Sequence, residues 1–121
     1  MGIALYWFKD YKISEYKDVY FDGYYDFRLI ECNSTSHSAR NAILVQNLFF
    51  SITNKAFPMI PGCSFINSTD FCLDLIEPND MLKYCNEILK NQKVDLLNLR
   101  SKFEWFKKYS EEGYYIAYEC W

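Results

Sequence analysis

The chain has 121 residues, with 16 acidic and 13 basic side chains and a formal net charge of −3. Half of its residues are hydrophobic and 20% are aromatic, which excludes an intrinsically disordered chain and provides enough apolar material for one buried core. The acidic balance argues against a general nucleic-acid binder, because neutralising a phosphate backbone requires a basic surface. We expect one domain covering residues 1–121.

The sequence predicts a cytoplasmic protein. The N-terminal apolar run meets a charge at Lys9, which is too early for a secretory signal, and the longest uncharged run, residues 41–54, contains several polar side chains and is too short for a membrane span. The five cysteines form no C-x-x-C pair and most lie in apolar sequence. We therefore expect reduced thiols that are mostly buried, as is usual in a reducing compartment.

Three strands are predicted at the start of the chain. Residues 2–8 form a short, bulky apolar run typical of a buried strand. Residues 16–21 and 24–32 are rich in aromatic and β-branched side chains and flank Asp22-Gly23. This dipeptide adopts the positive φ angles of a tight turn, so the two runs are predicted to form a hairpin.

The middle of the chain is predicted to contain a helix and a second hairpin. Residues 33–38 are a polar break whose serines are suited to cap a helix, and residues 39–53 follow as a largely buried helix. The apolar residues that indicate this helix include Ala42, Ile43, Leu48, Phe49 and Ile52. Residues 63–66 and 71–76 are predicted strands around a turn-rich segment.

Two helices and a strand are predicted at the end of the chain. One helix starts near Pro78 and ends at Asn91, and a second runs from Asp95 to a left-handed cap at Gly113. Residues 114–121 form a terminal strand. The order β-β-β-α-β-β-α-α-β predicts an α+β domain, with an antiparallel or mixed sheet and about three helices packed on it.

The sequence contains no catalytic or cofactor motif, so we expect no cofactor and no bound metal and favour a non-enzymatic role. The four glycines are scattered and form no phosphate-binding loop. The segment before the predicted helix at residue 39 combines hydroxyl groups with His37 and Arg40, a set that can bind an anion at a helix N-terminus. A small hydrolase or transferase using His37, Arg40 and a Cys or carboxylate is therefore the alternative function.

Acidic side chains and tyrosines are interleaved in the predicted first hairpin, and a second acidic stretch lies at residues 70–80. Residues 1–80 contain ten acids and six bases, a net charge of −4, whereas residues 81–121 carry +1. Exposed tyrosine next to aspartate is typical of a protein-binding surface. The candidate binding residues are Asp18, Tyr20, Asp22, Tyr24, Asp26, Asp70, Asp74 and Glu77.

In its small size, its acidity and its Tyr and Asp content, the chain resembles the immunity proteins that neutralise bacterial toxins. The resemblance implies an inhibitor that covers a basic active-site surface of a toxin or nuclease, without contacting nucleic acid or membrane itself. Complementary charge would steer the encounter and tyrosines would anchor the complex. A further alternative is a structural subunit of a larger assembly, with an exposed edge at residues 114–121.

Overall fold

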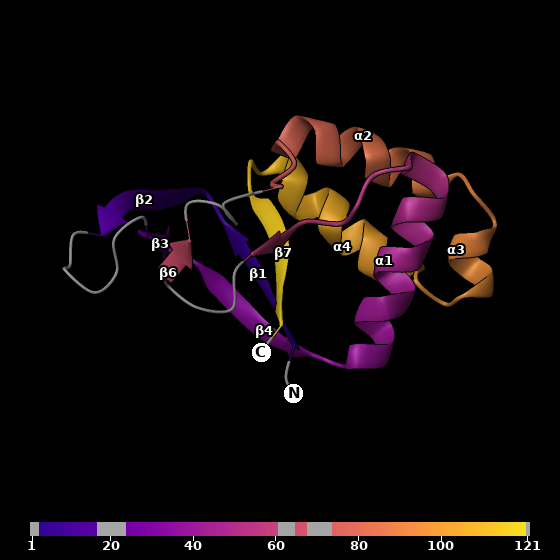
Figure 1. The fold of residues 1–121 in the computed structure, drawn as a ribbon. Helices are drawn as coiled ribbons and strands as arrows, with labels where there is room; N and C mark the ends of the chain where they lie inside the picture. Colours follow the sequence, from indigo (N-terminus) through magenta and orange to yellow (C-terminus); the bar gives the residue numbers. More distant parts are fainter. Residues whose placement is uncertain (1–2, 17–23, 61–64, 68–73, 121) are drawn as a thin grey trace.

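The computed structural model has an α+β fold, as the sequence predicts, and describes residues 3–16, 24–60, 65–67 and 74–120 (Figure 1). Helices gather at one end of the molecule and strands at the other. The elements are β1 (Ile3–Phe8), β2 (Asp10–Tyr16), β3 (Tyr24–Ile30), β4 (Asn33–His37), α1 (Ala39–Thr53), β5 (Met59–Ile60), β6 (Phe65–Asn67), α2 (Pro78–Leu89), α3 (Lys93–Leu96), α4 (Arg100–Glu111) and β7 (Tyr115–Cys120).

The strands form two sheets. The first has the order β4-β1-β7-β5 and is mixed, because β5 pairs parallel with β7 while the other pairs are antiparallel. The second is antiparallel, with the order β2-β3-β6. The predicted exposed edge at residues 114–121 is wrong over Tyr118–Glu119, where β5 pairs with β7 on the side away from β1. Among the described strands, β4 is the long edge of the first sheet.

Strands β1 to β4 are one long antiparallel ribbon with a bend in it. The pairing of β1 with β4 and that of β2 with β3 keep the same register on both sides of the bend. The bend falls where Glu31 adopts a left-handed φ of 51°. The predicted first hairpin is therefore corrected, because Tyr24–Ile30 pairs with Asp10–Tyr16. Residues 17–23, which include most of the predicted first arm and the Asp22-Gly23 turn, lie outside the described residues.

The predicted polar break at residues 33–38 is also wrong, because Asn33–His37 is strand β4. Residues 33–36 have short polar side chains, and the strand is held by backbone pairing with β1, where Thr35 lies opposite Leu5. The helix that follows begins as predicted. The Ser38 side chain accepts a hydrogen bond from the backbone N–H of Asn41 at 3.2 Å, which caps α1.

Helix α1 has the predicted bounds but buries a different set of residues. Ala42, Leu48 and Phe49 are buried as expected, whereas Ile43 is exposed. The predicted strand at residues 71–76 is wrong for 74–76, which lead into α2 without pairing. Residues 71–73 lie outside the described part of the chain.

Helix α2 starts at Pro78 as predicted, but the predicted helix from Asp95 to Gly113 is divided into α3 and α4. Asn98 lies between them with a left-handed φ of 56°, which ends the first segment. Leu96, an apolar residue at the start of the predicted helix, is 77% exposed. Gly113 has a φ of +89°, so the left-handed cap after α4 is confirmed.

Two clusters of buried side chains lie on opposite faces of the first sheet. The larger one joins the sheet residues Leu5, Ile116 and Tyr118 to α1, α2 and α4. The smaller one contains Phe8 and Ala117 from the first sheet and Phe27 from the second. No helix in the described ranges is both long and apolar enough to cross a bilayer.

Candidate functional site

The structure places only part of the predicted binding set. Four of the eight residues lie outside the described chain, namely Asp18, Tyr20, Asp22 and Asp70. Tyr24 begins β3 opposite Tyr16. Of the remaining three residues, Asp26 lies in one hollow and Asp74 and Glu77 lie in another.

Asp26 lies in a hollow of about 330 Å³ lined by Lys12, Ser14, Asp26 and Arg28. Arg28 Nε donates a hydrogen bond to Asp26 Oδ2 at 2.8 Å, and the Asp26 side chain is 14% exposed against 72% for Arg28. Two basic side chains and one acid give this hollow a net positive charge. Asp26 thus lies among basic side chains in the described part of the hairpin, and its role in binding stays a prediction.

Asp74 and Glu77 lie together in a second hollow of about 370 Å³, which we call the acidic cavity. It is formed where the chain leaves α1 and where it enters α2. Its lining residues are Lys55, Ala56, Asp74, Leu75, Ile76, Glu77, Asp80 and Tyr84. Among the described lining residues, three carboxylates and one ammonium give a net negative charge.

Glu77 is positioned by a tyrosine from the neighbouring strand. The hydroxyl of Tyr115 in β7 donates a hydrogen bond to Glu77 Oε2 at 2.9 Å. Burial, followed by the Glu77 carboxylate and then by Tyr11 and Asp10, raises the pKa of Tyr115 to about 12. The tyrosine consequently stays protonated at neutral pH and keeps donating to Glu77.

One aromatic side chain lines the acidic cavity, and another precedes two of its lining residues in the sequence. Tyr84 is half-buried, and its ring packs edge-on against the buried Phe49 with centroids 5.7 Å apart. Phe50, which follows Phe49 in the chain, is 55% exposed in the last turn of α1, shortly before Lys55 and Ala56. The core thus fixes the ring of Tyr84 in the cavity lining, and Phe50 precedes the lining residues Lys55 and Ala56 in the sequence.

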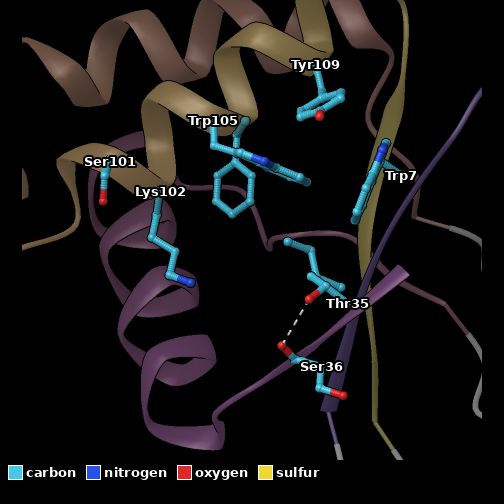
Figure 2. Close-up of a pocket in the computed structure, with 9 residues that line it drawn as sticks. Trp7, Thr35, Ser36, Ser101, Lys102, Trp105 and Tyr109 are labelled. Carbon is cyan, nitrogen blue, oxygen red and sulfur yellow. Dashed lines mark hydrogen bonds between the residues drawn. The ribbon is translucent and has the colours of Figure 1, made fainter. Parts of the chain in front are cut away.

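A third hollow, of about 610 Å³, was not predicted from the sequence. We call it the aromatic groove; it lies between α4 and the β1–β4 edge of the first sheet (Figure 2). Its lining residues are Leu5, Trp7, Thr35, Ser36, Ser101, Lys102, Trp105, Phe106 and Tyr109. The sequence signal was the recurrence of Lys102, Trp105 and Tyr109 along one face of α4, but spacing alone does not separate a groove wall from a buried face.

The cysteines and the predicted anion site have ordinary surroundings where they are described. Cys85 is buried and burial raises its pKa to about 12, whereas Cys32 is exposed. Arg40 is exposed in the first turn of α1. Among the described residues, no three His, Cys, Asp or Glu side chains are grouped as metal ligands.

Comparison with known proteins found no family model, no curated protein and no solved structure with a significant match to this chain.

Proposed function

We propose that this protein binds a partner protein through the acidic cavity and inhibits it by covering a basic surface, in the manner of an immunity protein. The observation that carries the proposal is that Asp74, Glu77 and Asp80 line one hollow, where Lys55 is the one basic side chain of the described lining. Such a concentration of like charge attracts a basic surface and steers its approach.

The surroundings of the cavity support a stable complex as well as a fast encounter. Tyr84 is held by Phe49, and Glu77 by Tyr115, so neither side chain has to be ordered on binding. Phe50 adds an exposed aromatic side chain of the kind that anchors interfaces. The matching partner would present arginine or lysine at the cavity and an apolar pocket for Phe50.

The test uses two double variants that remove the same amount of charge. Glu77→Gln with Asp80→Asn neutralises two carboxylates of the acidic cavity, and glutamine retains an acceptor for Tyr115. Glu111→Gln with Glu112→Gln neutralises two exposed carboxylates at the end of α4. Both double variants change the net charge by +2. A difference between their association rates therefore depends on where the charge is removed and not on the total charge.

A tagged wild-type protein would first be used to purify partners from its native host, and the association rate of each partner would then be measured with both doubles. We expect the cavity double to slow association about tenfold at low salt and to flatten the salt dependence, while the control double stays within about twofold of wild type. Equal rates for the two doubles would overturn the acidic cavity as the docking site. A partner enzyme that keeps its activity when saturated with wild-type protein would overturn the inhibitor role.

A further inference from the structure

Helix α1 differs from α2 and α4 in having almost no charge. Among the 15 residues of α1, all of them in the described part of the chain, Arg40 is the one charged side chain. Helix α4 has six charged side chains in 12 residues, and α2 has three in 12. The exposed face of a helix in water is normally polar and charged, whereas the centre of a protein interface is poor in charge. The outer face of α1 therefore has the composition of an interface.

Exposed side chains of α1 follow one line along the helix. Ile43, Asn47 and Phe50 are all exposed, and they are separated by four and then three residues. This is the spacing at which side chains form the seam between two packed helices. Ile43 is 54% exposed and Phe50 is 55% exposed. We call these three residues the α1 row, and its two large apolar side chains fit a second helix that lies along α1.

Strand β5 adds an apolar side chain beside the α1 row. Met59 is 38% exposed, and Gln46 Nε2 donates a hydrogen bond to Met59 Sδ at 3.7 Å. Gln46 belongs to the turn of α1 between Ile43 and Phe50. The row is thus part of a wider uncharged surface, and removing its apolar side chains from water would drive association.

The two ends of the α1 row differ in charge. Arg40 is exposed in the first turn of α1. Phe50 lies in the last turn of this fully described helix, where no basic side chain opposes the partial negative charge of the helix C-terminus. The chain then passes to Lys55 in the lining of the acidic cavity, where Glu77 and Asp80 are exposed. A helix bound along the row is therefore attracted when its end beside the cavity is basic.

We propose that the α1 row binds an amphipathic helix of the partner protein, with the apolar stripe of that helix on Ile43 and Phe50 and its lysine or arginine side chains at the acidic cavity. The inference rests on the proposed function and deepens it, because it names the element of the partner that binds. Ile43 precedes Phe50 by two turns, about 10 Å along the helix axis. It therefore contributes to binding only when the partner lies along α1.

Three synthetic peptides of the length of α1 are the probes. The lysine peptide has leucines at three- and four-residue spacing on an alanine and glutamine background, with lysines in its last turn. The glutamine peptide has glutamines in place of those lysines, and the same side-chain staple holds both peptides helical. The proline peptide is the unstapled lysine peptide with prolines substituted in its middle, which prevent a continuous helix. Fluorescence anisotropy at low salt measures their affinities for the protein.

The lysine peptide should bind wild-type protein about tenfold more tightly than the glutamine peptide, because its charges meet the acidic cavity. The proline peptide should not bind. Absence of binding by the lysine peptide at about 1 mM would overturn the proposal. Equal affinity of the lysine and proline peptides would show that no helix is required, and equal affinity of the lysine and glutamine peptides would show that the cavity takes no part; either result overturns the proposal.

Two matched variants locate the peptide. Ile43→Ser and Leu96→Ser each remove one exposed apolar side chain from a helix, so neither should alter the fold. Ile43→Ser should weaken binding of the lysine peptide about tenfold, because the burial of an isoleucine side chain is lost. Leu96→Ser should stay within about twofold of wild type. Equal losses for the two variants would show that the peptide binds elsewhere and would overturn the assignment.

The cavity variant and the oligomeric state complete the test. Glu77→Gln with Asp80→Asn should remove the difference between the lysine and glutamine peptides, and a difference that persists would overturn the role of the cavity. A second copy of this chain is the competing occupant of the α1 row. Sedimentation velocity should show a monomer for wild type and for Ile43→Ser. A wild-type dimer that Ile43→Ser dissociates would overturn the proposal.

Failure of this inference is distinguishable from failure of the proposed function. If the lysine peptide does not bind while the cavity double still slows association of the purified partner, the helix is the wrong element and the proposed function stands. If the cavity double leaves that association rate unchanged, the proposed function fails and this inference fails with it.

Discussion

Among the described residues, the two faces of the first sheet have buried clusters of very different size. On the helix side, buried residues from β1 and β7 join side chains from every helix, including Val94 of the one-turn α3. On the other side, the described core consists of Phe8, Phe27, Ile60 and Ala117, with half-buried rings such as Tyr11 around them. Within the part of the chain that the structure describes, more side chains are buried between the sheet and the helices than on the other face of the sheet.

Truncation in the helix-side core should have the largest effect. Phe106 is fully buried and its ring lies 5.3 Å from Phe57 and 5.4 Å from Phe103. Phe106→Ala should lower the free energy of unfolding by about 4 kcal/mol, because a large cavity forms among side chains that cannot collapse into it. Urea denaturation followed by circular dichroism measures this loss. A loss below about 1 kcal/mol would contradict the division into a major and a minor core.

The corresponding truncation on the other face should cost less. Phe27 packs against Tyr11, with centroids 6.0 Å apart, in the smaller cluster. Phe27→Ala should lower the free energy of unfolding by about 2 kcal/mol, since a smaller cluster relaxes more easily around the cavity. Denaturation under the same conditions gives the value. If Phe27→Ala costs as much as Phe106→Ala, the two cores contribute equally and the comparison fails.

The helix-side core also predicts a loss of stability in alkali. Burial raises the pKa of Cys85 to about 12 from a reference value of 9.0, so the folded state keeps the thiol proton while the unfolded state loses it. The stabilising contribution of this group is complete below pH 9 and is lost as pH rises from 9 through 12.

The measurement is the free energy of unfolding at two pH values in wild type and in Cys85→Ala. Wild type should lose about 1 kcal/mol more than the variant between pH 8 and pH 10. Because the alanine variant is less stable at both pH values, the test compares how much free energy of unfolding each protein loses between pH 8 and pH 10. Identical slopes would show that Cys85 is not protected by this core.

The smallest effect is expected on the outer face of α1, where the neighbouring residues Phe49 and Phe50 have opposite environments. Phe49 is fully buried and Phe50 is 55% exposed. Phe50→Ser should change the free energy of unfolding by less than about 0.5 kcal/mol, as exposed substitutions usually do. Under the proposed function, the same variant should raise the dissociation rate of the partner. A large loss of stability would instead place Phe50 in the core.

Features decided by nearby residues were predictable from the sequence. The bounds of α1 follow from a serine cap and a helical apolar pattern, and the start of α2 follows from Pro78 with Asp80 in the first turn. Gly113 has a positive φ, a conformation that glycine adopts without strain. Asp74, Glu77 and Asp80 line one cavity because they are close in sequence, and their role in binding stays a prediction.

Features decided by distant residues were not predictable from the sequence. Asn33–His37 has the composition of a loop, and it is a strand because β1 supplies hydrogen-bond partners along its backbone. The break between α3 and α4 depends on Asn98 adopting a left-handed conformation that its sequence permits but does not require. The aromatic groove brings Trp7 together with Trp105 and Lys102 from the far end of the chain. Local sequence patterns specify helix caps and apolar faces. Strand pairing and the spaces between packed layers form only when burial brings together residues that are far apart in sequence.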